Sequence, residues 1–375
     1  MVFMISISHH CIGRGLPSRS RRGWTAFFGG SLAPGYHEDG FMPDSPRRGI
    51  ATNFLFVATN MIALVCLAWV LIGTDWGELG NNLRHLHWWW IGVSVVTNLL
   101  VYLVQAWRWC LVLAPVADVP FWQSVRAVYI GLFANEVLPL KAGEIIRCFL
   151  IGRWNDLPIS VTLASALIER IFDGFWLIAS LLLAVHFTPH VHPFIMRAGA
   201  FLTVLVFVCA VFIGIAMFWK QQALDAVMNT PWLGWAHVLI QDLHQIGHSR
   251  YLYYAFAVSL PYLVLETMPI YALFRAFGPL SELSMKVAFV LMVFIRLGSA
   301  VPQAPGNIGL FHYAAARTLE MFAVARGLAY GFSVLLFAGI TLPLLVAGLV
   351  AVGVSEVKMG EVHREAQEEA NHRRR

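Results

Sequence analysis

Phe133–Leu150 reads FANEVLPLKAGEIIRCFL, an apolar run that carries charged residues, a proline and a glycine in its middle. An ionisable side chain at the centre of a membrane helix costs about 2.5–3.5 kcal/mol on insertion scales, so such residues face the bundle interior and have partners there. Pro139 removes a helical hydrogen bond and clashes with the preceding turn. The stretch therefore predicts a helix broken at membrane depth, where its freed backbone is buried in protein or lines a wet cavity.

The composition of the whole chain is that of a polytopic membrane protein. Of its 375 residues, 58% are hydrophobic and 13% are charged, whereas a soluble globular protein is about 45–50% apolar and about 25% charged. The formal net charge of +5 comes with arginines gathered at the termini and in short loops, which indicates membrane topology and no nucleic-acid partner. The 5 cysteines show no CxxC or Cys/His ligand spacing, so we expect no disulfide framework, no metal site and no cofactor.

Apolar runs of about 20 residues, the length that crosses the hydrocarbon core, predict the spans. The continuous candidates are Thr52–Gly73, Trp88–Leu113, Ile159–Phe187, Phe194–Trp219, Tyr251–Phe277 and Leu328–Val354. Two further runs, Ser124–Gly152 and Met285–Ala325, are interrupted at LPLKAGE and at SAVPQAPGNIG. We therefore predict an all-α polytopic membrane protein with about six continuous spans and two broken or re-entrant helix pairs, about eight helical elements in all.

Charges beside the first span predict the orientation. Asp75 and Glu78 follow this span, and the arginines that precede it are Arg14, Arg19, Arg21, Arg22, Arg47 and Arg48. This asymmetry places the N-terminus in the cytoplasm. We expect the tail on the same side, so the crossings are even in number: about six if the broken pairs are re-entrant, or about ten if they cross. The re-entrant arrangement would bring two broken hairpins together from opposite faces, as in inverted-repeat transporters.

Three regions of the chain differ in composition. Residues 1–49 are rich in Gly, Ser, Pro and Arg and are predicted to be disordered, with Met42 as an alternative natural start. Residues 50–355 are predicted to form the transmembrane domain, and residues 356–375 a charged cytoplasmic tail. We expect a multi-pass protein of the cell inner (plasma) membrane.

Two charged groups inside the apolar runs form the candidate site. Glu144 lies three residues from both Lys141 and Arg147, so the three share a broad helix face. The stretch ALIERIFDGFW, residues 166–176, adds two carboxylates and an arginine. We predict one paired, buried network, which either holds helices together or lines a cavity for a lipid headgroup or its phosphate. Lys141 and Arg147 near a restarted helix N-terminus would suit an anion.

The candidate residues of a substrate path or headgroup site are Asn135, Glu136, Lys141, Glu144, Arg147, Glu169, Arg170, Asp173, Arg296, Gln303 and Asn307. The candidate backbone breaks are Pro139, Gly143, Pro302, Pro305, Gly306 and Gly309. By contrast, Arg108 ends the second span beside tryptophans, and we interpret it as an arginine that extends to the membrane interface. We interpret His312 as a packed polar residue and not as a catalyst.

Three ordered motifs resemble the membrane region of lysylphosphatidylglycerol synthase and the stand-alone flippase-like proteins that share it. Asn135, Leu138, Pro139, Gly143, Glu144 and Arg147 fill an Asn-x-x-Leu-Pro-x-x-x-Gly-Glu-x-x-Arg pattern; Glu169, Arg170 and Asp173 fill Glu-Arg-x-x-Asp; Pro305, Gly306 and Gly309 fill Pro-Gly-x-x-Gly. The resemblance covers about residues 50–355. Where the family commonly carries an acidic residue shortly after the last glycines, this chain has Phe311 and His312.

The resemblance implies a membrane protein that moves or binds a lipid with a polar or phosphate headgroup between leaflets, with membrane lipids as partners. Two alternatives stay open: a membrane subunit or scaffold of a lipid- or glycan-synthesis enzyme, and an intramembrane transferase. The sequence shows no nucleotide-binding loop and no nucleophile–base motif, and a short tail follows the last span. We therefore do not expect lysyl transfer by this chain alone.

Overall fold

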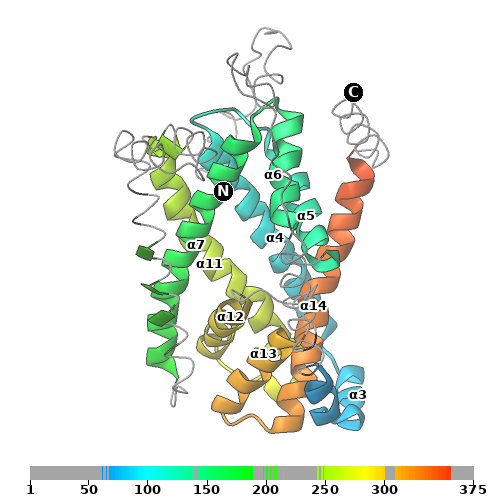
Figure 1. Ribbon diagram of the computed structural model, residues 1–375. Helices are drawn as coiled ribbons and strands as arrows, with labels where there is room; N and C mark the ends of the chain where they lie inside the picture. The colour runs from blue at the N-terminus through cyan, green and yellow to red at the C-terminus, as the bar shows by residue number, and fades with distance from the viewer. Residues whose placement is uncertain are drawn as a thin grey trace, which may run out of the picture. The chain divides into compact units, whose positions relative to one another are not determined.

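The computed structural model describes residues 61, 65, 67–138, 142–188, 243–244, 246–247, 249–299 and 309–355, with scattered positions between 197 and 214 (Figure 1). All of these residues belong to one compact unit, Thr59–Arg375. Every regular element in them is helical. The α-helices are α3 (Trp76–Arg84), α4 (Trp88–Leu113), α5 (Phe121–Val137), α6 (Gly143–Trp154), α7 (Ile159–Phe187), α11 (Arg250–Ala276), α12 (Met285–Ser299), α13 (Leu310–Met321) and α14 (Arg326–Val354), and Gly278–Leu280 forms the 3₁₀ helix η3.

The described helices confirm the all-α prediction and support only part of the predicted span count. Helices α4 and α7 begin and end at the residues that the apolar runs predicted. By length and composition, three described helices are long and apolar enough to cross a membrane: α4, α11 and α14. The predicted runs Thr52–Gly73 and Phe194–Trp219 lie largely outside the described residues. The count of about six spans is therefore not confirmed.

Both predicted interruptions fall between helices. Helix α5 ends at Val137, Leu138 is extended with φ −96° and ψ 145°, and α6 begins at Gly143. An extended residue is what the steric clash with a following proline favours. Helix α12 ends at Ser299, and α13 begins after Gly309, whose φ of 95° suits a residue without a Cβ. The predicted break and path residues Pro139, Lys141, Pro302, Gln303, Pro305, Gly306 and Asn307 lie outside the described residues.

Helices α5 and α6 form a hairpin in which their backbones touch. Asn135 Oδ1 accepts a hydrogen bond from Gly143 N at 2.9 Å, which satisfies one donor of the first turn of α6. A Cβ on Gly143 would collide with the backbone oxygen of Gly131, and a Cβ on Gly131 would lie 3.1 Å from Cβ of Arg147. Glycine at both positions therefore sets how closely α6, with Arg147, approaches α5.

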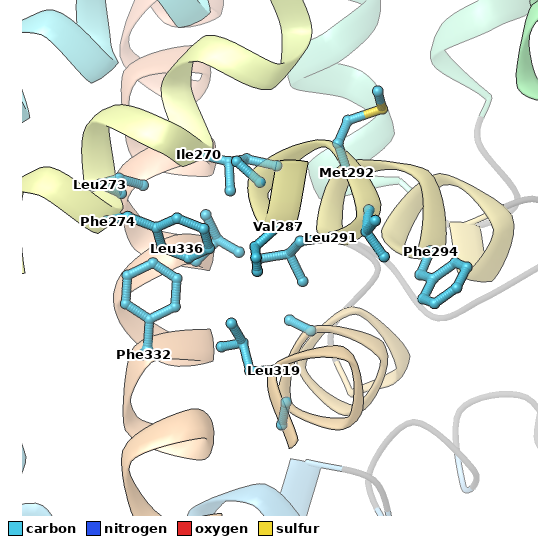
Figure 2. Packing of buried hydrophobic residues seen from close by; sticks show 14 of the residues in the cluster. Ile270, Leu273, Phe274, Val287, Leu291, Met292, Phe294, Leu319, Phe332 and Leu336 are labelled. Atoms are coloured by element: carbon cyan, nitrogen blue, oxygen red, sulfur yellow. The ribbon is translucent and has the colours of Figure 1, made fainter. Parts of the chain in front are cut away.

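Helix α14 joins two hydrophobic clusters. One cluster has members in α3, α7, α11, η3, α12, α13 and α14, and Figure 2 labels Ile270, Leu273 and Phe274 of α11, Val287, Leu291, Met292 and Phe294 of α12, Leu319 of α13, and Phe332 and Leu336 of α14. The other cluster surrounds the buried Trp109 and Leu113 of α4 and reaches Leu344 of α14. The first half of α14 thus packs against α11 and α13, and its second half packs against α4 and α5.

Gly143→Ala is expected to destabilise the protein by about 1–3 kcal/mol, the usual cost of overpacking, because α5 and α6 must separate to admit the new methyl group. The thermal midpoint of the detergent-purified protein measures this loss. Gly92→Ala in α4 is the control, because nothing lies within 4 Å of its added Cβ and alanine favours a helix. Equal midpoints for the two variants would contradict the close contact of α5 and α6.

Candidate functional site

Glu169 of α7 is a fully buried carboxylate that joins two arginines from two other helices. Its Oε1 lies 3.2 Å from Nη2 of Arg108 on α4, and its Oε2 lies 2.9 Å from Nη2 of Arg147 on α6. Arg108 and Glu169 have exposed fractions of 0%. One side chain thus ties α4, α6 and α7 together.

Two further carboxylates and a third arginine complete a closed circuit, which we call the charged ring. Glu144 Oε2 lies 2.9 Å from Nη2 of Arg147 and 3.3 Å from Nη2 of Arg170. Asp173 lies 3.5 Å from Arg170 through Oδ2 and 2.6 Å from Arg108 through Oδ1. Each acid therefore sits between two arginines, and the formal charges of the ring sum to zero.

The charged ring is buried on one side and open on the other. The side chains of Arg108, Arg147 and Glu169 are at most 3% exposed, whereas those of Glu144 and Arg170 are 34% and 48% exposed. Burying a charge is costly unless it is paired and hydrogen-bonded. The buried half has such partners, and the open half is where another molecule can reach the ring.

Aromatic side chains and a hydroxyl support the two buried arginines. The guanidinium of Arg147 lies 4.5 Å from the ring centre of Trp109, whose Nε1 donates to Ser165 Oγ at 2.9 Å. Arg108 Nη1 donates to Ser259 Oγ at 3.2 Å. Within the described part of the chain, Nη1 of Arg147 is buried and has no hydrogen-bond partner. An arginine N–H in this state can donate to a ligand oxygen without losing an existing hydrogen bond.

A second polar group lines a cavity of about 170 Å³. Glu266 Oε2 of α11 lies 2.6 Å from Nη1 of Arg296 on α12, and both residues face this cavity together with Glu136 of α5. We call it the Glu266–Arg296 cavity. An engineered cavity of about 150 Å³ holds a benzene molecule, so this one has room for a small polar group.

Tyr262 of α11 lies between the charged ring and the second group. The guanidinium of Arg108 is 5.0 Å from its ring centre, and that of Arg296 is 5.7 Å away. Both distances are within the range of cation–π attraction. A shift of α11 at Tyr262 would therefore change the cation–π contacts of both Arg108 and Arg296.

The structure brings together the predicted Glu144, Arg147, Glu169, Arg170 and Asp173 in one paired network. It places the predicted Glu136 and Arg296 at the separate cavity, and Asn135 at the start of α6. Lys141, Gln303 and Asn307 lie outside the described residues. His312 is 3% exposed, and its Nδ1 accepts from Gly309 N at 3.4 Å, so it packs at the start of α13.

The interpretation of Arg108 as an interfacial arginine was wrong. Its side chain is fully buried and makes ion pairs with Glu169 and Asp173. Glu266 was missed altogether, although it is an acidic residue inside the predicted span Tyr251–Phe277. The cost of an ionisable residue in a span was the available signal for Glu266, whereas an arginine near the end of a span, such as Arg108, can also extend to the interface.

Comparison with known proteins agrees with this architecture. The family model of the lysylphosphatidylglycerol synthase TM region matches residues 55–348. The chain belongs to this family. The match includes every described helix except the last turns of α14. It therefore includes both the charged ring and the Glu266–Arg296 pair. The chain is an integral membrane protein of a family associated with lipid handling. No curated protein and no solved structure matches the chain.

Arg108→Ala and Arg147→Ala are each expected to lower the free energy of unfolding by about 3–5 kcal/mol, because each leaves two acids of the ring with one arginine instead of two and buries an excess negative charge. Urea or thermal unfolding in detergent, with folded yield, measures the loss. Arg84→Ala in α3 removes an exposed arginine and is expected to stay within about 0.5 kcal/mol of the parent. Wild-type stability for Arg108→Ala would show that the charged ring does not hold the helices.

Proposed function

We propose that this protein moves a lipid with a phosphate-containing headgroup between leaflets, and that the headgroup binds at the open side of the charged ring. The observation that carries the proposal is the asymmetry of the ring, in which Glu144 and Arg170 are accessible while Glu169 and Arg108 are sealed. Ionisable residues inside membrane segments commonly mark substrate paths.

A phosphate can enter the ring by taking the place of Glu144. The ring is neutral, so an added anion would leave an excess negative charge unless a carboxylate moves out. Glu144 is the most exposed of the three carboxylates, so its return to water costs least. Phosphate oxygens would then contact Arg170 and the Nε and Nη2 of Arg147 that Glu144 vacates, and arginine binds phosphate through such paired donors.

The buried half of the ring would keep its geometry during this exchange. Glu169 would hold Arg147 from one side, as it does in the structure at 2.9 Å. Arg147 would also keep its contact with Trp109. The site therefore offers a fixed guanidinium and an exchangeable counter-ion. This combination binds an anion and releases it again, which a transport path requires.

Arg170→Ala is expected to reduce lipid movement at least tenfold while the thermal midpoint changes little, because exposed ion pairs contribute about 0–1 kcal/mol. The assay uses purified protein in vesicles that contain acyl-labelled phosphatidylglycerol, with a membrane-impermeant quencher to follow the label between leaflets.

Arg317→Ala is the matched control. Arg317 is 42% exposed and pairs with an acid three residues away, Glu320, as Arg170 does with Asp173. It is expected to move lipid at the parent rate. Equal rates for the two variants would contradict a headgroup site at Arg170. A new lipid species after incubation would favour a transferase instead.

A further inference from the structure

An apolar groove of about 740 Å³ runs along the seam between α4 and α14, with α5 as its third wall. Its lining includes Leu99 and Leu103 of α4, Tyr129 of α5, and Leu342 and Val346 of α14. We call this the α4–α14 groove. Its apolar walls and elongated course along the helices match the chemistry of an acyl chain.

The Glu266–Arg296 cavity lies on the other side of the same seam. Asn98 and Tyr102 of α4 line the cavity, whereas their neighbours Leu99 and Leu103 line the groove. Thr341 of α14 lines the cavity and Leu342 lines the groove. Since adjacent residues of the same helices face the two spaces, the wall between them is one layer of helices. Asn98 and Thr341 also lie near the middle of α4 and α14, so the cavity is at mid-depth along these helices.

The seam is held in a way that allows it to part. Asn98 Nδ2 donates to the backbone oxygen of Ile340 at 2.8 Å, a single polar contact that can be exchanged for one to a ligand. Pro343 lies inside α14 and has no N–H for the carbonyl of Gly339, so the helix can bend beside this contact. Helices α4 and α11, in comparison, pack more extensively, and Ser94 Oγ donates to Pro269 O at 3.0 Å.

The end of the groove carries a cation, Arg126. Arg126 of α5 lines the groove, donates to the backbone oxygen of Trp122 at 3.4 Å and lies 5.4 Å from the ring centre of Trp154. No carboxylate of the described residues forms an ion pair with it. An arginine beside tryptophans at a helix end is typical of the membrane interface, where it attracts anionic lipid.

We propose that the α4–α14 seam is a lateral opening for a two-chain anionic phospholipid. The lipid first docks with its acyl chains in the α4–α14 groove and its phosphate at Arg126. The seam then parts at Asn98, and the headgroup passes into the Glu266–Arg296 cavity, a second headgroup position at mid-depth besides the open side of the charged ring, while the acyl chains stay in the groove. This inference rests on the proposed function and adds the route by which the lipid enters.

A cross-link across the seam tests the opening. Leu103→Cys and Val346→Cys are introduced together into a variant whose native cysteines are replaced, and a short bifunctional thiol reagent links them. The cross-linked protein is expected to lose at least nine-tenths of its movement of acyl-labelled phosphatidylglycerol in vesicles, and the same variant without reagent is expected to retain it.

The control pair spans a different seam. Val104→Cys on α4 and Leu260→Cys on α11 line a second apolar groove, of about 470 Å³, and their cross-link is expected to leave lipid movement unchanged. Movement that survives the α4–α14 cross-link overturns the lateral opening. A protein that moves no lipid before any cross-link contradicts the proposed function instead.

Photolabelling tests the docked lipid without any transport. Phosphatidylglycerol with a photoreactive acyl chain is expected to label the α4–α14 groove more than the α4–α11 groove. Arg126→Gln should lower this labelling about fivefold, the factor expected from the loss of one interfacial cation, and should leave labelling by phosphatidylcholine unchanged. Equal labelling of the two grooves, or no effect of Arg126→Gln, overturns the docking site.

Discussion

The buried carboxylate of Glu169 between Arg108 and Arg147 is the constraint on which the other charged contacts depend. Two guanidiniums at this depth are tolerable only with acids in contact, and Glu169 meets both of them at 3.2 and 2.9 Å. Because the three residues come from α4, α6 and α7, their pairing fixes where these helices lie. Asp173 pairs with Arg108, and Glu144 pairs with Arg147. Arg170 contacts both of these acids and so closes the ring.

The break between α5 and α6 makes this pairing possible. A continuous helix from Phe121 to Trp154 would carry Arg147 far from Gly131, since each helical residue advances about 1.5 Å. The reversal instead stacks Gly131 against the start of α6, where Asn135 satisfies Gly143 N. Gly131 and Gly143 are therefore needed for the same reason as the charges of the opening stretch. They let α6 pack against α5 so that Glu144 and Arg147 face α7.

Sequence reasoning recovered what is local and missed what depends on distant partners. The ends of α4 and α7, the two breaks and the Glu144–Arg147 pair follow from runs and spacings within about thirty residues. Arg108 could not be placed in this way, because its acids lie 61 and 65 residues further along the chain. A single arginine near the end of an apolar run has the same sequence pattern whether it extends to the interface or is paired inside. Glu266 has its arginine 30 residues away, on another helix.

The separation of a sealed half from an open half limits where a ligand can act. An anion that displaced Glu169 would leave the carboxylate with no route to water and would loosen three helices at once. An anion that displaced Glu144 would replace one of the two acids at Arg147 and would otherwise affect the first turn of α6, next to the break, and the half-exposed Arg170. The most deeply buried acid, Glu169, is therefore structural, and Glu144, beside the interrupted backbone, is the one that the proposed ligand would displace. In the proposed exchange the two roles fall on one short helix, because Arg147, the fixed cation, follows Glu144, its replaceable counter-ion, by three residues along α6.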